Sequence, residues 1–251
     1  MVPGQDSRAA RRWWDGEAAA YQEEHGGFLG PQRFVWGPEG LTEEAAGLLG
    51  AVAGLCVLEV GCGAAQCAAW LAARGATVVA LDVSAAQLRH ARRQAGVGLV
   101  QADALALPLR DARVDLACSA YGAVPFVADL VALHTEVARV LRPGGRWVFS
   151  TTHPLRWCFP DDPTEEGLRA THPYFDRTPY TEVDEHGQLT YAEFHATLGD
   201  HLEALRAGGF TLEALVEPPW PPDNAQVWGG WSPLRGRLLP GTLILAARRE
   251  G

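Results

Sequence analysis

Between residues 55 and 152, short apolar runs alternate with longer segments in which apolar residues recur at helical spacing. The helical segments cover residues 64–74, 84–95 and 126–141. The runs, each short enough for a buried strand, are CVLEV, ATVVALD, VGLVQAD, RVDLACS and RWVFSTT. Strands that alternate with helices form a doubly wound, mostly parallel sheet with right-handed crossovers. We therefore predict an α/β fold.

The segments around these runs complete the predicted architecture. A helix is predicted over residues 41–54 with Thr42 as its N-cap, and a capping box from Ser84 to Gln87 opens the helix over 84–95. The other predicted features are a turn over 142–145, a hairpin over 178–197 that turns at 185–187, a helix over 199–209, and strands over 210–217 and 242–249.

Composition speaks against several classes of function. The formal net charge of −9 disfavours a nucleic-acid partner, since binding to a phosphate backbone usually needs a basic face. No apolar run reaches the roughly 20 residues of a membrane span, and the N-terminus lacks the apolar centre of a secretory signal. We therefore expect a cytoplasmic protein without membrane association. The five cysteines contain no CxxC pair, so neither a disulfide framework nor a metal site is expected.

Acidic residues end three successive predicted strands. Glu59 lies at the end of the first strand, Asp82 ends the second, and Asp103 ends the third. The glycines Gly61 and Gly63 follow the first strand and let backbone amides approach a ligand at the start of a helix. Ligands of doubly wound sheets bind at the carboxyl ends of the strands. The sequence therefore predicts a binding site at this edge.

The residue types at this edge indicate which ligand they suit. A dinucleotide-binding turn would carry a third glycine where this chain has Gln66. Asp82 can accept both hydroxyls of a ribose, and Asp103 can meet an adenine amino group. Glu59 suits a cationic group and would be unfavourable beside phosphates. The implied ligand is a nucleoside joined to a cationic amino acid, without phosphate.

These stretches resemble the motifs of the class I S-adenosylmethionine-dependent methyltransferases, in the small-molecule branch often labelled type 11. VLEVGCGAAQ is similar to the first motif of that family and VVALDVS to the second. QADALALPLRDARVDLACS resembles its adenine-contacting stretch and fourth strand, and VARVLRPGGRWVFS its fifth strand. The resemblance implies a seven-stranded sheet with an antiparallel last strand, an inserted hairpin or lid after the fifth strand, and S-adenosyl-L-methionine as cofactor.

The resemblance also implies roles for single residues. Expected cofactor contacts are Glu59, Gly61 and Gly63 at the methionine portion, Asp82 at the ribose, Asp103 with Ala104 at the adenine, and additionally Ser119 and Tyr21. Two departures stand out: the third glycine of the family is Ala65 here, and SAYGAVP replaces the Asn/Asp-Pro-Pro motif of exocyclic-amine methyltransferases. Nucleic-acid bases and glutamine side chains are therefore disfavoured as acceptors.

With this resemblance, we interpret the chain as a single methyltransferase domain in four parts. The parts are an N-terminal helical lid over 1–54, a cofactor-binding core over 55–152, an inserted substrate lid with a hairpin over 153–198, and a C-terminal helix with the last strands over 199–251.

Methyl transfer from a sulfonium is an in-line displacement, so alignment of the reactants supplies much of the rate and a general base is optional. If a base is used, His153, directly past the fifth predicted strand, is the best-placed candidate, and His25 and His195 are alternatives. Tyr121 either lines the channel for methyl transfer or packs as a buried tyrosine.

Ten aromatic residues outside the motifs either wall an apolar substrate pocket or pack the lid onto the sheet: Trp14, Phe28, Phe34, Trp36, Trp157, Tyr174, Phe175, Tyr180, Trp228 and Trp231.

We predict a methyltransferase for a small-molecule acceptor that is apolar or aromatic. Two alternatives stay open: an S-adenosylmethionine-binding sensor or scaffold without catalysis, and a nicotinamide-dependent oxidoreductase. The accepting atom and the oligomeric state also stay open.

Overall fold

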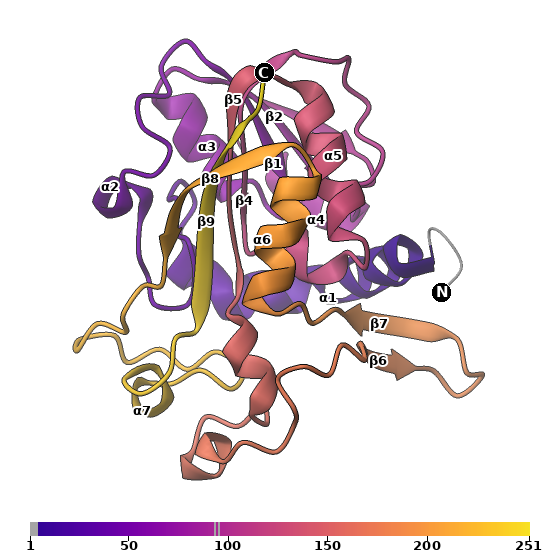
Figure 1. Cartoon of the computed structure of the whole chain (residues 1–251), viewed down its shortest axis with the longest axis vertical. Coiled ribbons are helices and arrows are strands. Elements are labelled where there is room, and N and C mark those ends of the chain that lie inside the picture. The colour runs from indigo at the N-terminus through magenta and orange to yellow at the C-terminus, as the bar shows by residue number, and fades with distance from the viewer. Residues whose placement is uncertain (1–4, 93, 95) are drawn as a thin grey trace.

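Seven strands form one sheet in the order β3-β2-β1-β4-β5-β9-β8. The computed structural model describes residues 5–92, 94 and 96–251 (Figure 1). The first five strands pair in parallel, whereas β9 is antiparallel to both β5 and β8. The predicted fold class is therefore confirmed. The strands are β1 (Cys56–Val60), β2 (Thr77–Asp82), β3 (Val97–Gln101), β4 (Val114–Ala120), β5 (Leu141–Thr152), β8 (Phe210–Val216) and β9 (Thr242–Arg249).

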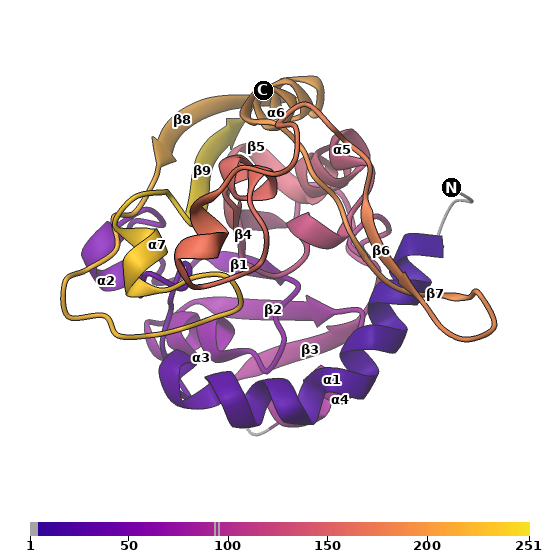
Figure 2. The same ribbon diagram turned by 90° about the horizontal axis from the view of Figure 1, so that it is seen from below.

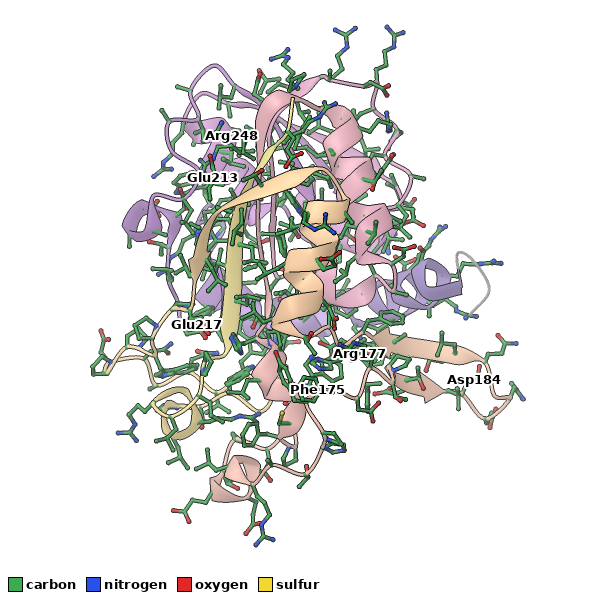
Figure 3. The ribbon with its side chains drawn as sticks, viewed as in Figure 1. Phe175, Arg177, Asp184, Glu213, Glu217 and Arg248 are labelled. Carbon is green, nitrogen blue, oxygen red and sulfur yellow. The ribbon has the colours of Figure 1, made fainter. Side chains whose placement is uncertain are left out.

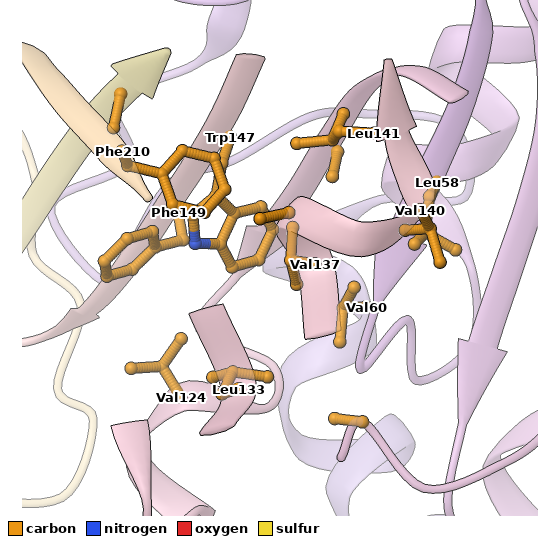
Figure 4. Packing of buried hydrophobic residues seen from close by; sticks show 14 of the residues in the cluster. Leu58, Val60, Val124, Leu133, Val137, Val140, Leu141, Trp147, Phe149 and Phe210 are labelled. Atoms are coloured by element: carbon orange, nitrogen blue, oxygen red, sulfur yellow. The ribbon is translucent and has the colours of Figure 1, made fainter. Parts of the chain in front are cut away.

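Helices cover both faces of the sheet, and an apolar cluster lies under each layer. The elements are α1 (Gln5–Leu29), α2 (Glu43–Ala46), α3 (Gln66–Ala73), α4 (Ala85–Ala91), η1 (Val124–Phe126), α5 (Leu130–Val140), η2 (Pro154–Cys158), η3 (Glu165–Leu168), α6 (Leu198–Ala207) and α7 (Pro233–Gly236). On one face, α5 and α6 pack over Trp147, Phe149 and Phe210 (Figure 4). On the other face, the apolar cluster contains residues of α3 and α4 together with Phe34 and Trp36 from the segment after α1.

The carboxyl edge of the parallel strands is covered by three further pieces of chain. Figure 2 shows α1 crossing this edge below β2 and β3, with the hairpin of β6 (Tyr180–Val183) and β7 (Leu189–Glu193) beside it. The loops around η2, η3 and α7 lie over the remaining part. Because α1 contacts both α4 and β7, it joins the hairpin to the core.

The helix predicted over 41–54, its Thr42 cap and the turn predicted over 142–145 need correction. The helix expected over 41–54 is a single turn, because Gly47 adopts the left-handed conformation (φ 61°) and ends it, and the Thr42 side chain makes no cap. The turn expected over 142–145 lies inside β5, where the pairing with β4 shifts register between Val114 and Leu116.

The capping box at α4 is only half formed. The Ser84 hydroxyl accepts the Gln87 N–H as expected. The Ser84 N–H, however, donates to Asp82 rather than to Gln87, whose side chain accepts from Gln22 instead. Residues 93 and 95 of the helix predicted over 84–95 lie outside the described residues.

Two kinds of feature are absent from the described residues. No helix among them has both the length and the apolar character that a membrane crossing needs. No group of three or more His, Cys, Asp or Glu side chains in the same part of the chain is arranged to hold a metal ion.

Candidate functional site

A cavity of about 150 Å³ lies at the carboxyl edge of the sheet. It brings together eight of the ten predicted site residues: Tyr21, Glu59, Gly61, Gly63, Asp82, Asp103, Ala104 and Tyr121. Helix α1 contributes Ser7, Trp14, Tyr21 and Gln22 to the lining, so the cavity lies between this helix and the strand ends. The predicted edge is therefore a real concave site, and α1 forms one side of it.

Glu59 is a buried carboxylate with one free oxygen. Glu59 is 3% exposed, and its Oε2 atom has no hydrogen-bond partner. The backbone N–H of Ala68, in the first turn of α3, and the thiol of Cys67 donate to the carboxylate. Burial nevertheless raises the pKa of Glu59 to about 8. A cation bound in the cavity would satisfy Oε2 and stabilise the ionised form.

Gly61 and Gly63 are required for different structural reasons. Gly61 has φ 70°, and a Cβ on it would lie 2.6 Å from the Ala123 nitrogen, so its bare backbone makes room for the loop after β4. Gly63 has φ 53°, and a Cβ on it would meet only Gln87 Oε1 at 3.8 Å, an ordinary contact, so the glycine is needed for its conformation. Both glycines line the cavity, so close approach of their backbone to a ligand stays a prediction, and Gly61 additionally makes room for Gly122 and Ala123.

Asp82 holds the turn together. Its Oδ2 atom accepts the Gly63 N–H at 2.8 Å, and its Oδ1 atom accepts the Ser84 N–H at 2.8 Å. Burial raises the pKa of Asp82 above its usual range, although both N–H groups oppose this shift. Each carboxylate oxygen can accept a second hydrogen bond, so Asp82 can still bind a ligand hydroxyl.

Side chains of α1 bind the loops that carry the predicted contacts. The Ser7 hydroxyl donates to Asp103 Oδ2 at 2.5 Å, and Asp15 accepts from the Ser84 hydroxyl and the Ala86 N–H. Gln22 donates to Gln87 Oε1 at 3.1 Å and accepts from Gln66 at 3.2 Å. Ser7, Asp15 and the three glutamines were missed by sequence reasoning, because these hydrogen bonds join residues between 44 and 96 positions apart.

Aromatic side chains line the part of the cavity away from the carboxylates. Trp14 packs edge-on against Tyr21 and against Phe126, and Tyr21 packs against Trp228. Trp228 in turn stacks on His25 with 3.9 Å between ring centroids. All except His25 line the cavity. The cavity is therefore acidic on one side and apolar on the other.

Most of the ten aromatic residues that could have formed the substrate pocket do not line the cavity. Only Trp14 and Trp228 of that set line the cavity. Phe34 and Trp36 are fully buried in the core beside α3, and Phe175 is 74% exposed. For Phe34 and Trp36 the packing alternative is therefore correct.

His153 and Ser119 do not line the cavity. The His153 Nδ1 atom accepts the Leu155 N–H at 3.1 Å, so the proton lies on Nε2, which donates to Glu217 at 2.8 Å. Glu217 follows β8, as Figure 3 shows. The expected general base is thus a structural residue with both nitrogens engaged. Ser119 is fully buried, and its Oγ atom accepts the Ala123 N–H at 3.3 Å, so it supports the loop rather than a ligand.

The two alternative general bases, His195 and His25, also lie outside the cavity lining. His195 Nε2 lies 2.7 Å from the Tyr174 carbonyl oxygen and outside the cavity lining. His25 is buried behind Trp228, and burial lowers its pKa. Neither histidine lines the cavity in the described structure.

Comparisons with known proteins first identify the core. A family model for the type 11 methyltransferase domain matches residues 58–149. A malonyl-[acyl-carrier protein] O-methyltransferase of Pseudescherichia vulneris is 45% identical over 96 residues, which are 38% of this chain and 38% of that one. A ubiquinone/menaquinone biosynthesis C-methyltransferase of Acidiphilium cryptum is 42% identical over 85 residues, 31% of this chain and 34% of that one. The matches thus span little more than a third of these curated relatives.

A solved structure extends the similarity to most of the chain. An S-adenosylmethionine-dependent methyltransferase from Mesorhizobium loti is 30% identical, with a TM-score of 0.66, over 85% of this chain and 100% of that one. The chain belongs to the S-adenosylmethionine-dependent methyltransferases. The cofactor of this family fits the cavity, because the buried Glu59 lines it with a free Oε2 atom that accepts from an ammonium group once the carboxyl is ionised.

Proposed function

We propose that this methyltransferase transfers a methyl group from S-adenosylmethionine to a small-molecule acceptor with an apolar or aromatic body. The observation that carries the proposal is the two-sided cavity, with Glu59, Asp82 and Asp103 on one side and Trp14, Phe126 and Trp228 on the other. A cofactor bound along the acidic side would direct its methyl group toward the apolar side. The oxygen- and carbon-methylating relatives share the same core, so this core does not determine the accepting atom.

Each residue of the acidic side has a proposed part in holding the cofactor. Glu59 Oε2 would accept from its ammonium group, Asp82 would accept from the ribose hydroxyls, and Asp103 with Ala104 would contact the adenine. Tyr21 on α1 would cover the bound cofactor. The cofactor supplies an activated methyl group, and the protein's contribution is to exclude water and align the acceptor. The four-part division of the chain into lid, core, inserted lid and C-terminal segment is part of this proposal.

The decisive experiment is calorimetric titration of the protein with S-adenosylhomocysteine. We expect micromolar binding that Asp82→Ala weakens about ten-fold or more, which corresponds to about 1.4 kcal/mol. Asp184→Ala is the matched control, since Asp184 also accepts two backbone N–H groups, from His186 and Gln188, but lies in the hairpin turn (Figure 3) and outside the cavity lining.

Two outcomes would contradict the proposal. A folded wild-type protein that does not bind S-adenosylhomocysteine would remove its basis, and a titration with nicotinamide dinucleotides would follow. A protein that binds it but turns over no member of a broad panel of aromatic and acyl acceptors would instead be a sensor or scaffold.

A further inference from the structure

Tyr121 occupies a strained backbone conformation at the cavity. Its φ is 54°, in the left-handed region that favours glycine and is unfavourable for a residue with a side chain. The Ser150 hydroxyl accepts the Tyr121 N–H at 3.0 Å and holds the backbone in place. Tyr121 is one of the residues that line the cavity, so this strain lies at the site itself.

The Tyr121 hydroxyl donates to the Gly241 carbonyl oxygen and lies beside the Thr242 hydroxyl, which can donate to it. Its Oη atom lies 3.0 Å from the Gly241 carbonyl oxygen and 3.3 Å from the Thr242 Oγ1 atom. The Thr242 hydroxyl in turn donates to Glu39 Oε2. If the tyrosine proton points to Thr242, the three side chains form a continuous chain of O–H groups. The chain ends in a carboxylate.

Glu39 is enclosed at the far end of this chain. It is 2% exposed, and no ion pair to it is found among the described residues. Gly37 and Gly241 leave room for it, because a Cβ on Gly37 would lie 2.9 Å from Glu39 Oε2 and one on Gly241 would lie 2.5 Å from Oε1. A buried carboxylate without a cation, fitted between two glycines, is a proton acceptor separated from bulk water.

We infer that Tyr121, Thr242 and Glu39 form a proton relay that deprotonates a hydroxyl acceptor, most simply a phenol, during methyl transfer. The acceptor oxygen attacks the methyl carbon, and the carbon–sulfur bond breaks, leaving its electron pair on sulfur. The acceptor proton passes to Tyr121 Oη as the tyrosine proton moves to Thr242 Oγ1 and the threonine proton moves to Glu39 Oε2. This inference rests on the proposed function and deepens it by naming the acceptor class.

The charged groups around the relay support this direction of proton movement. Burial raises the pKa of Glu39, so its carboxylate accepts a proton more readily than an exposed glutamate does. Burial also raises the pKa of Tyr121, and Glu39 adds to that effect while Arg156 on η2 opposes it. Tyr121 therefore passes protons on as a neutral hydroxyl rather than ionising by itself. The aromatic lining from Trp14, Phe126 and Trp228 matches the ring of a phenol.

The test uses 4-nitrophenol as the probe, because its phenolate absorbs visible light and its neutral form does not. Wild-type protein is first titrated with S-adenosylhomocysteine, and the saturated complex is then titrated with 4-nitrophenol at a pH where the free probe is neutral. We expect bound probe to appear as phenolate. Glu39→Gln, Thr242→Val and Tyr121→Phe should each lower the phenolate fraction about ten-fold, equal to about one pKa unit.

Controls separate the relay from general damage to the fold. Thr242→Ser keeps the hydroxyl and should retain the wild-type spectrum, and Glu43→Gln changes another buried glutamate, which binds Trp36 and Leu49 instead. Retained binding of S-adenosylhomocysteine shows that each variant is folded.

The outcomes distinguish the relay from the proposed function. Failure of the wild type to bind S-adenosylhomocysteine overturns both. Binding of the cofactor product with a neutral probe, with no bound probe, or with phenolate that persists in Glu39→Gln overturns the relay alone.

Discussion

Burial without a cationic partner makes Glu59 unusual at the residue scale. The carboxylate receives the Ala68 N–H and the Cys67 thiol, yet its Oε2 atom is unpaired and its pKa is raised to about 8. At neutral pH the free protein therefore carries mainly the protonated form. An ammonium group placed beside Oε2 favours the carboxylate, so ligand binding and proton release are coupled.

We expect S-adenosylhomocysteine binding at about pH 7 to release close to one proton from Glu59. Affinity should therefore rise with pH until the pKa of about 8 is passed and then level off. Calorimetry in two buffers of different ionisation enthalpy counts the released protons. Glu59→Gln should abolish the release and weaken binding about ten-fold or more. Equal proton release by wild type and variant would show that another group titrates.

The glycines of the first turn allow a second test at the residue scale. Gly61→Ala forces a Cβ against the Ala123 nitrogen, whereas the Cβ of Gly63→Ala makes only an ordinary contact with Gln87 but has an unfavourable φ of 53°. We expect Gly63→Ala to lower the free energy of unfolding by about 1–2 kcal/mol, and Gly61→Ala to lower it by clearly more. Urea unfolding measures both values. Equal losses would mean that the Gly61–Gly122 contact relaxes easily.

At the scale of single elements, the sequence predicted strands and helices well where the signal is local. Strands β1, β2 and β4 are apolar runs bounded by turns, and Ser84 caps α4 as expected. The helix expected over 41–54 failed because its apolar pattern continues past Gly47, whose left-handed conformation ends the first turn. An apolar pattern shows which residues are buried but does not show whether the backbone between them is helical.

The α5–α6 pair contains two buried histidines whose charge state matters for stability. His134 accepts the Trp147 indole N–H at Nδ1, and His201 lies on α6 with an unpaired Nδ1 atom. Burial lowers the pKa of His134 to about 3 and that of His201 to about 4. In the unfolded chain, each histidine binds a proton near pH 6.5, about the value for a free side chain. Between these limits the unfolded state binds more protons, so acid favours unfolding.

We expect the free energy of unfolding to fall below about pH 6.5, each of these histidines contributing up to about 1.4 kcal/mol per pH unit. Urea unfolding at about pH 7, 6 and 5 measures the slope. His201→Leu should make it shallower, whereas His186→Leu, at an exposed position of the hairpin turn, should leave it unchanged. An unaltered slope in His201→Leu would assign the acid sensitivity to other groups.

At the scale of the whole molecule, the sequence predicted one side of the cavity and not the other. The acidic side could be predicted because Glu59, Asp82 and Asp103 lie at or just past the carboxyl ends of strands that meet at one edge. The α1 side depends on where a 25-residue helix docks, which is determined by contacts such as Ser7 with Asp103 across 96 positions. The position of His153 directly after β5 could also be predicted. Its hydrogen bond to Glu217 after β8 could not, because it is a long-range contact.

The same distinction between local pattern and long-range packing separates two tryptophans. Trp36 is fully buried and donates to Glu43 at 2.9 Å, whereas Trp228 lines the cavity and stacks on His25. We expect Trp36→Ala to cost about 3–5 kcal/mol of unfolding free energy. Trp228→Ala should change stability and S-adenosylhomocysteine affinity much less, yet abolish most turnover of an acceptor found by screening. These outcomes are read from urea unfolding, calorimetry and methyl-transfer assays on both variants. A Trp228→Ala protein that unfolds like Trp36→Ala would make the aromatic side a packing core, and the acceptor would then have to enter from elsewhere.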